Sequence, residues 1–178
     1  MRCLAINSSI FLLAILIGCT GVPEGVAPVR NFELNRYLGK WYEIARLDHS
    51  FERGLELVTA EYSLRDDGGV RVVNRGYSPE DGEWSEIEGT ARFVDKPNVG
   101  YLKVSFFGPF YGSYVVFELD TEHYEYAFVS GSSKSYLWLL SRTPYVSDAL
   151  LARFRARAGE LGFPLEKLVY VVQEQDTK

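Results

Sequence analysis

The chain has 178 residues, a formal net charge of −5 and an aromatic share of 15%. This length suits one domain with one hydrophobic core, and the aromatic share suits a core rich in β-strands. The acidic balance, without a basic stripe, argues against a nucleic-acid partner and against attachment to a membrane by charge alone.

The N-terminal part of the chain is expected to lie outside the fold. Arg2 precedes an apolar stretch over residues 10–18, which is too short to span a bilayer but has the length of the apolar part of an export signal. The letters "LIGC" resemble the bacterial lipobox, which predicts a signal peptide over 1–18 and a lipid on Cys19. An ordinary secretory signal with an incidental cysteine is the alternative. Residues 19–31, rich in Gly and Pro, are interpreted as a flexible tether.

The rest of the chain, residues 32–176, is expected to form one β-rich domain. Turn signals built from Asp, Gly, Pro and Ser separate runs rich in Val, Tyr, Phe and Thr. Together they predict eight strands, near residues 41–48, 57–65, 70–77, 85–94, 100–107, 113–119, 124–130 and 135–141. The short connections favour an up-and-down antiparallel meander.

A helix is predicted after the eighth strand. Ser147 is a candidate N-cap, Phe154 and Ala158 belong to an apolar helical stripe, and Gly162 can end the helix. A short strand over 168–172 follows. One amphipathic helix cannot cover both faces of an eight-stranded sheet, so the sheet either closes into a barrel or splits into a sandwich. We expect the closed barrel, with the sandwich as the alternative.

An eight-stranded barrel has room inside for side chains or for one small ligand. An apolar interior that was open at both ends would fill with water, so one end is expected to be closed. Residues 35–38 are interpreted as a short helical turn that leads into the first strand. Gly39 would allow a close backbone approach there, and Trp41 would project into the floor of the barrel.

Three short motifs resemble those of the lipocalin family. Gly39-x-Trp41 opens the first strand, Leu119-Asp120 lies at the turn after the sixth, and Arg142 closes the eighth. The stretches "YLGKWYEIAR", "FERGLE", "TAEYSLRDDGG", "KVSFFGPFYG" and "YLWLLSRTP" are similar, in this order, to the outer-membrane lipoprotein lipocalins of Gram-negative bacteria, with apolipoprotein D as an animal relative. The resemblance implies that Arg142 covers Trp41 at the closed end. The sequence around Asp120 departs from the family's Thr-Asp-Tyr pattern.

Strand alternation and the resemblance together predict which side chains face the interior and contact a ligand. They are Ala60, Tyr62, Asn74, Leu102, Val104, Phe106, Tyr114, Val116, Ala127, Val129, Trp138 and Leu140. The alternative is that these side chains fill a solid core. Tyr62, Tyr114 and Asn74 carry polar atoms into a dry interior, and they need partners from a ligand head group, from ordered water or, for Asn74, from a neighbouring strand.

The segment "FFGPFYG", residues 106–112, is too apolar for a solvated hairpin tip. It is interpreted as a rim that grips ligand, a membrane-touching loop, a contact in a homodimer or a self-packed hairpin.

An apolar barrel with one closed end is typical of a binding site for an oily molecule. The resemblance implies a fatty acid or lysophospholipid as ligand, transport or storage in the cell envelope, and an outer-membrane location through the lipid on Cys19. No metal or cofactor is implied. A structural lipoprotein with a filled barrel is the alternative function. A lipid-modifying enzyme has less support, because no G-x-S-x-G motif occurs and His49 is expected to be a solvated loop residue.

Overall fold

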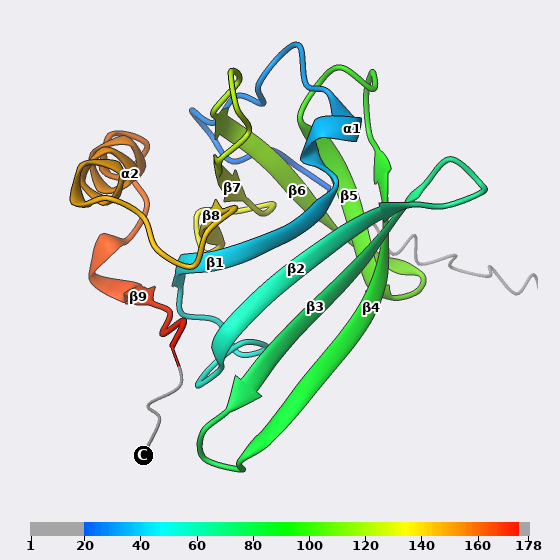
Figure 1. Cartoon of the computed structure of the whole chain (residues 1–178). Helices are drawn as coiled ribbons and strands as arrows, with labels where there is room; N and C mark the ends of the chain where they lie inside the picture. Colours follow the sequence, from blue (N-terminus) through cyan, green and yellow to red (C-terminus); the bar gives the residue numbers. More distant parts are fainter. Residues whose placement is uncertain (1–19, 175–178) are drawn as a thin grey trace, which may run out of the picture.

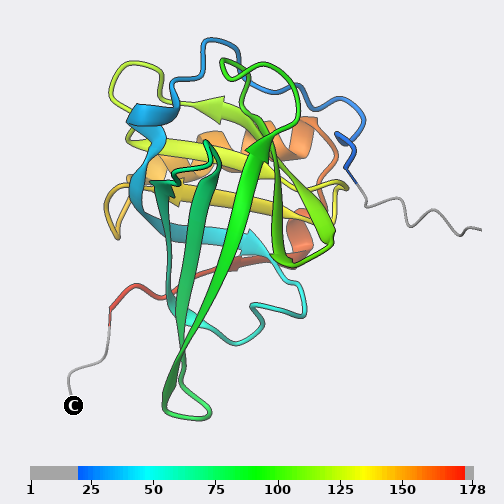
Figure 2. The same cartoon turned by 90° about the vertical axis from the view of Figure 1, so that its right-hand side faces the viewer.

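The computed structural model describes residues 20–174, so the predicted signal peptide over 1–18 and Cys19 lie outside the described residues. Within this range the chain forms a closed antiparallel barrel with a long helix against its side (Figures 1 and 2). Its strands are β1 (Gly39–Leu47), β2 (Glu56–Leu64), β3 (Val70–Ser78), β4 (Glu83–Phe93), β5 (Tyr101–Phe107), β6 (Phe110–Leu119), β7 (Tyr126–Ser130), β8 (Leu137–Ser141) and the short β9 (Leu168–Tyr170). The predicted eight-stranded barrel is confirmed.

The barrel closes because β1 pairs with strands on both of its sides. Each strand from β1 to β7 pairs antiparallel with the next strand along the chain, as an up-and-down meander requires. Tyr42 of β1 lies opposite Thr59 of β2 on one side and opposite Ser141 of β8 on the other. Pairing of β1 with both β2 and β8 closes the sheet into a barrel, and therefore the sandwich alternative is wrong.

Beyond Tyr42, β1 separates from β2, and the C-terminal segment occupies the gap. The Gln173 side-chain amide donates to the carbonyl of Glu43 on β1 at 2.7 Å and to that of Val58 on β2 at 2.9 Å. The backbone N–H of Leu57 also donates to the carbonyl of Val172 at 2.8 Å. The chain end thus satisfies backbone groups that strand pairing leaves free at this place.

Two hydrophobic clusters lie on opposite sides of the barrel wall. One fills part of the interior around Trp41, and the other lies between the outer wall and helix α2 (Asp148–Glu160). Ser147 caps this helix, since its Oγ accepts the N–H of Leu150 at 3.3 Å. Phe154 and Ala158 of α2 are fully buried against the wall, as their helical spacing predicts.

The two remaining helical elements are the short α1 (Leu34–Tyr37), which leads into β1, and a 3-10 turn (Leu165–Lys167) before β9. Among residues 20–174, none of the helices has the length and apolar character needed to cross a bilayer.

The N-terminal segment differs from the predicted tether. Val26 is buried in the outer cluster, and the N–H of Val29 donates to the carbonyl of Val116 at 2.8 Å. In turn the N–H of Gly100 donates to the carbonyl of Val29 at 2.9 Å. The expectation of a free tether over 19–31 is therefore corrected for residues 22–31, because their valines bury apolar surface and their backbone pairs with the barrel.

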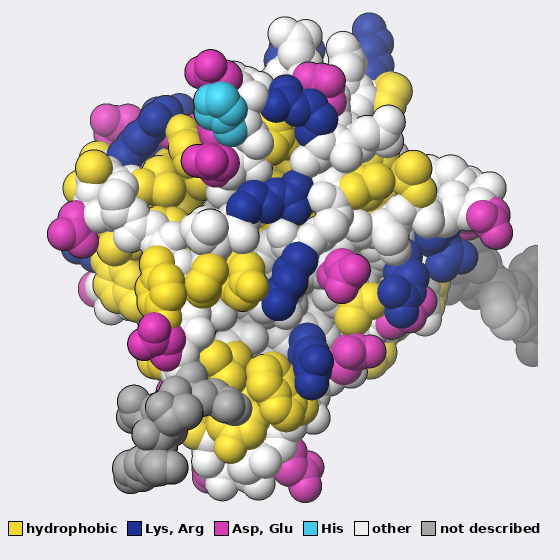
Figure 3. All heavy atoms as spheres, viewed as in Figure 1, with side chains coloured by type: hydrophobic (Ala, Val, Ile, Leu, Met, Phe, Trp, Pro, Cys, Tyr) yellow, Lys and Arg dark blue, Asp and Glu magenta, His cyan; other side chains and the backbone are white. Residues whose placement is uncertain are grey.

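Basic and acidic side chains lie interspersed on the face of the molecule that Figure 3 shows.

Candidate ligand-binding cavity

The barrel encloses a cavity of about 730 Å³. Nine of the twelve side chains predicted to face the interior line it, namely Ala60, Tyr62, Asn74, Leu102, Val104, Phe106, Tyr114, Trp138 and Leu140. The other three, Val116, Ala127 and Val129, are fully buried in the interior cluster that contains Trp41. The interior is thus packed solid near Trp41 and hollow beyond it. Ligand contact by these residues stays a prediction.

Trp41 and Arg142 close the packed end of the barrel. The indole is fully buried, and the Arg142 guanidinium carbon lies 3.9 Å from the centre of its ring. The same guanidinium donates hydrogen bonds of 2.7–2.9 Å to the backbone carbonyls of Arg36, Lys40 and Leu38. Gly39 has a φ of +92°, a conformation that side chains with a Cβ rarely adopt, and this bend brings α1 and β1 under the guanidinium.

Asp120 orders the turn between β6 and β7 at the same end. Its carboxylate accepts the backbone N–H groups of Glu122 and Glu125, both at 3.2 Å. Desolvation alone would raise the pKa of Asp120, but the surrounding backbone N–H groups outweigh it and lower that pKa. The carbonyl of Tyr124 in this turn accepts from Arg142 Nε at 3.3 Å. Asp120 thereby supports the closure indirectly, by fixing a loop that Arg142 contacts.

Three tyrosine hydroxyls form a hydrogen-bonded chain in the cavity wall. The Tyr114 hydroxyl lies 2.6 Å from that of Tyr37 and 2.9 Å from that of Tyr62. Burial raises the pKa of each hydroxyl, so all three are protonated at neutral pH. Two bonds use at most two of the three protons, which leaves a hydroxyl donor for a ligand. Asn74 Oδ1, in contrast, has no hydrogen-bond partner among the described residues.

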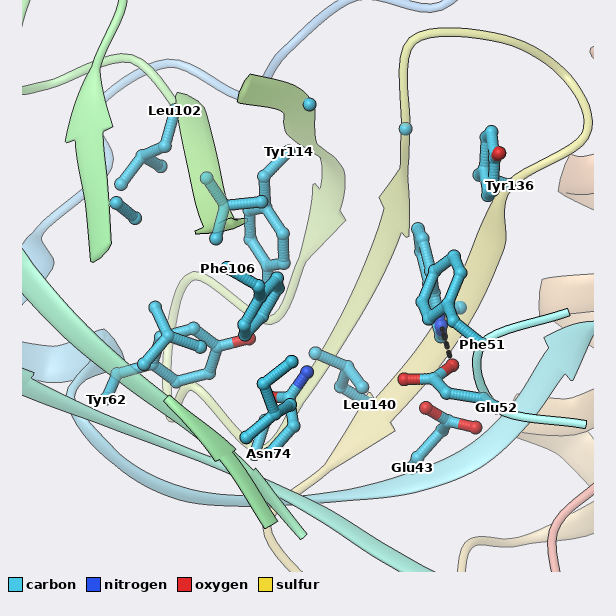
Figure 4. Close-up of a pocket in the computed structure, with 18 of the residues that line it drawn as sticks. Glu43, Phe51, Glu52, Tyr62, Asn74, Leu102, Phe106, Tyr114, Tyr136 and Leu140 are labelled. Carbon is cyan, nitrogen blue, oxygen red and sulfur yellow. Dashed lines mark hydrogen bonds between the residues drawn. The ribbon is translucent and has the colours of Figure 1, made fainter. Parts of the chain in front are cut away.

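Sequence reasoning missed a charged cluster in the opposite wall of the cavity (Figure 4). Glu43 and Glu52 both line the cavity and are almost completely buried. Arg46, only 2% exposed, donates through Nη1 to Glu43 Oε1 at 2.7 Å and through Nη2 to the carbonyl of Glu52 at 2.6 Å. The Trp138 indole N–H donates to Glu52 Oε2 at 3.1 Å. This wall therefore holds two carboxylates and one guanidinium.

His49 belongs to the same cluster, and the expectation of a solvated loop histidine is wrong. Its ring is only 7% exposed, stacks on Phe51 with ring centres 4.0 Å apart, and places Nε2 at 3.0 Å from Glu52 Oε2. The two atoms are in close contact, but the geometry of that contact does not fit a hydrogen bond. The reason for the burial is that the loop after β1 folds back against Trp138, whose ring centre lies 5.3 Å from that of His49.

Glu43 has an unusual protonation equilibrium. Desolvation raises its pKa well above the ordinary value, the nearby Glu52 carboxylate raises it further, and Arg46 opposes both effects. Strand alternation contained a signal for this residue, since Glu43 lies two positions after the inward-facing Trp41. The expectation of a dry interior obscured it, because a carboxylate is costly to bury without partners.

Aromatic side chains line the open end of the barrel. Phe107 is 72% exposed and Phe110 is 59% exposed, and they face each other across the hairpin between β5 and β6. Both line the rim of the cavity, together with Phe51 of the loop after β1. Because these rings are open to solvent, the self-packed hairpin is not the arrangement found. A grip on ligand, a membrane contact and a dimer contact all stay predictions.

Comparison with known proteins gives consistent matches over most of the chain. The family model described as a lipocalin-like domain matches residues 32–173. Outer membrane lipoprotein Blc of Vibrio cholerae serotype O1 is 63% identical over 169 residues, which cover 93% of this chain and 99% of the relative. Apolipoprotein D of Bos taurus is 36% identical over 154 residues, which cover 77% of this chain and 80% of the relative.

Solved structures match the barrel as well. Insecticyanin from the tobacco hornworm Manduca sexta has a TM-score of 0.67 and 21% sequence identity, with 87% of this chain and 88% of that chain covered. At this level of identity the match concerns the fold alone.

Proposed function

The chain belongs to the lipocalin family, and from this premise we propose that it binds one fatty acid or lysophospholipid molecule inside the barrel. The observation that carries the proposal is the cavity of about 730 Å³, open at the aromatic rim and closed at the Trp41 end. Its volume falls within the usual range for small-molecule sites, roughly 300–1,000 Å³. A structural lipoprotein with a filled barrel has less support, because the interior is hollow.

Burial of an acyl chain supplies enough free energy for such binding. Each methylene removed from water contributes about 0.8 kcal/mol, and ordering of the chain and of the complex opposes this gain. Micromolar affinity corresponds to about 8 kcal/mol. A long acyl chain can therefore reach this affinity with only a few polar contacts, and the Tyr114 hydroxyl chain and Asn74 offer such contacts.

The protein is localised to the outer membrane. A relative that matches this chain over nearly the whole length of both is an outer membrane lipoprotein. The lipobox-like residues that end at Cys19 supply a means of attachment. We place the lipid on Cys19, so that the barrel works in the cell envelope in transport or storage of its ligand. We expect Cys19→Ser protein to appear in the soluble fraction after cell fractionation, whereas the unchanged chain should remain with the membrane.

Binding has more support than catalysis. The family is one of binding proteins. Within residues 20–174, no group of three His, Cys, Asp or Glu side chains is arranged to hold a metal ion. His49 and Glu52 are in contact, but no serine or cysteine in the described part of the chain is hydrogen-bonded to that pair.

Tryptophan fluorescence tests the proposal directly. Trp138 lines the cavity, Trp41 lies in the packed end, and Trp84 is on the outside beside Arg75. Delipidated protein without residues 1–19 is titrated with palmitate and with palmitoyl-lysophosphatidylcholine below their micelle concentrations. We expect saturable quenching with micromolar midpoints.

Two variants make the result specific to the cavity. Trp138→Phe should lose most of the quenching, whereas Trp84→Phe should keep it, because only the first ring meets the bound molecule. No saturable change with either lipid, in protein shown to be folded, would refute the proposal.

A further inference from the structure

We infer that the wall formed by Glu43, Phe51, Glu52, Tyr136 and Trp138, here called the acidic wall, recognises an alkylammonium group on the ligand. The inference deepens the proposed function and rests on it, since it names the headgroup chemistry for the same cavity.

The two carboxylates are built into the cavity rather than scattered on a surface. Glu43 is 4% exposed and Glu52 is 7% exposed, yet both line the cavity. Figure 4 shows the Glu52 carboxylate beneath the ring of Phe51 and the Glu43 carboxylate beneath that of Glu52, and the two groups are close enough to interact. A carboxylate in such a place has lost most of its hydration, and it needs a positive partner to offset that loss.

The protein's own side chains contact only one oxygen of each of the two carboxyl groups. Arg46 engages Glu43 through Oε1, while its other hydrogen bonds go to the backbone carbonyls of Glu52 and Leu55. Trp138 and His49 both approach the same oxygen of Glu52, Oε2. The second oxygen of each carboxylate receives no N–H from residues 20–174. One guanidinium thus faces two carboxyl groups. Burial and the Glu52 carboxylate raise the pKa of Glu43, so a proton on this pair and a ligand cation are alternative ways to balance its charge.

Aromatic faces surround the carboxylates. Phe51 and Tyr136 have ring centres 6.2 Å apart, and Tyr136 and Trp138 have ring centres 6.1 Å apart, both pairs with nearly parallel rings. All three rings line the cavity next to Glu52. Ring faces attract cations, most strongly where water is excluded, and carboxylates beside aromatic faces are typical of sites for quaternary ammonium groups.

The charge of the headgroup distinguishes two classes of ligand that fit the cavity, those with an ammonium group and those with a carboxylate. An ammonium group at this wall would be attracted by the Glu52 carboxylate and could take the place of the proton that Glu43 tends to hold, while a fatty-acid carboxylate would meet like charge. The hydroxyl chain of Tyr37, Tyr62 and Tyr114 lies across the cavity and is uncharged. A lipid that carries an ammonium group would therefore place that group at the acidic wall and its acyl chain along the apolar remainder.

Three probes with the same ten-carbon chain isolate the headgroup: decyltrimethylammonium, decanol and decanoate. Calorimetric titration is performed below the micelle concentrations and at one fixed pH for all three probes. We expect decyltrimethylammonium to bind roughly tenfold more tightly than decanol, and decanoate to bind more weakly than either.

Variants assign the preference to particular side chains. Glu52→Gln should reduce the preference for the cation over decanol to about twofold, with decanol affinity measured in the same variant as the reference. Phe51→Leu should weaken cation binding about threefold without any change in charge. Glu61→Gln removes an exposed carboxylate on β2 and serves as the matched control, which should keep the full preference. If Glu52→Gln does not fold, Glu43→Gln replaces it, with decanol binding as the check on the cavity.

The outcomes separate this inference from the proposed function. Decanol that binds as tightly as decyltrimethylammonium, or a cation preference that survives both Glu52→Gln and Glu43→Gln, refutes the acidic wall and leaves the proposed function standing. If none of the three probes binds to folded protein, the proposed function and this inference both fail.

Discussion

Individual buried residues that carry charge distinguish this cavity from a simple apolar pocket. Glu43 and Arg46 form an ion pair that is almost inaccessible to water, with Glu52 beside them. Desolvation and the neighbouring carboxylate favour the protonated form of Glu43 and so raise its pKa. A raised pKa in the folded state makes stability depend on pH, because folded and unfolded chains then bind different numbers of protons.

The sign of this dependence follows from the two pKa values. An unfolded glutamate loses its proton near pH 4.3, while the folded Glu43 keeps it to higher pH. The contribution of Glu43 to stability is therefore complete below about pH 4.3 and is lost as the pH rises through the folded value. We expect the free energy of unfolding of the unchanged protein to fall from pH 5 to pH 8 relative to that of Glu43→Gln.

Urea unfolding at several pH values measures this difference. Removal of the partner of Arg46 also changes stability at every pH, so the slope with pH is compared and not the absolute value. The control Glu61→Gln should keep the slope of the unchanged protein. Parallel curves for Glu43→Gln and the unchanged protein would show that Glu43 is ionised in the folded state over this range.

Among the structural elements, two segments outside the eight strands pack against the barrel and complete it. The C-terminal segment fills the gap where β1 separates from β2, through Gln173. The N-terminal segment packs against the barrel near β5 and β6, where the backbone of Val29 forms hydrogen bonds with Val116 and Gly100. If a lipid on Cys19 anchors the chain, only Thr20 and Gly21 separate that anchor from the packed segment, so the barrel would be held close to the membrane.

Truncation tests whether the N-terminal segment is part of the fold. A chain that begins at Phe32 loses the burial of Val26 and the two backbone hydrogen bonds of Val29. Burial of a valine contributes about 1.5–3 kcal/mol and each hydrogen bond about 0.5–1.5 kcal/mol, so we expect a loss of roughly 2.5–6 kcal/mol. Urea unfolding should show the loss for this chain but not for one that begins at Val22. Equal stability of both chains would restore the interpretation as a tether.

The hollow barrel couples ligand binding to the stability of the whole molecule. A ligand that binds only the folded chain stabilises it by about 2.7 kcal/mol at a free concentration of one hundred times Kd. Each kcal/mol corresponds to roughly 2–4 °C in Tm for a domain of this size. We expect saturating palmitoyl-lysophosphatidylcholine to raise Tm by about 5–10 °C in a calorimetric scan.

A cavity-filling variant provides the control for this measurement. Val104 on β5 is half-buried and lines the cavity, so Val104→Trp should occupy space that the ligand needs. Its Tm should then respond little to the same lipid. An equal rise in both proteins would place the lipid on the outer surface instead of in the cavity.

The sequence by itself determined the elements and the closed end. Strand alternation, turn residues and the Ser147 cap are local signals, and they located the eight strands and α2 to within a few residues. Gly39 and Trp41 followed from a short motif, because a positive φ and a large buried ring restrict which residues fit. The position of Arg142 over Trp41 followed from the resemblance to the lipocalin motifs. The same alternation, together with the family resemblance, selected twelve side chains, all of which the barrel turns toward its interior.

Only the tertiary structure decided how the cavity is charged and how the chain ends pack. His49 and Glu52 lie in a loop, where no periodic pattern indicates whether a side chain is solvated, and they become buried because the loop folds back onto Trp138. Val29 meets Val116 and Gly100 from a distant part of the chain. Contacts of this kind depend on where the closed barrel places each segment, and local sequence carries no information on that placement.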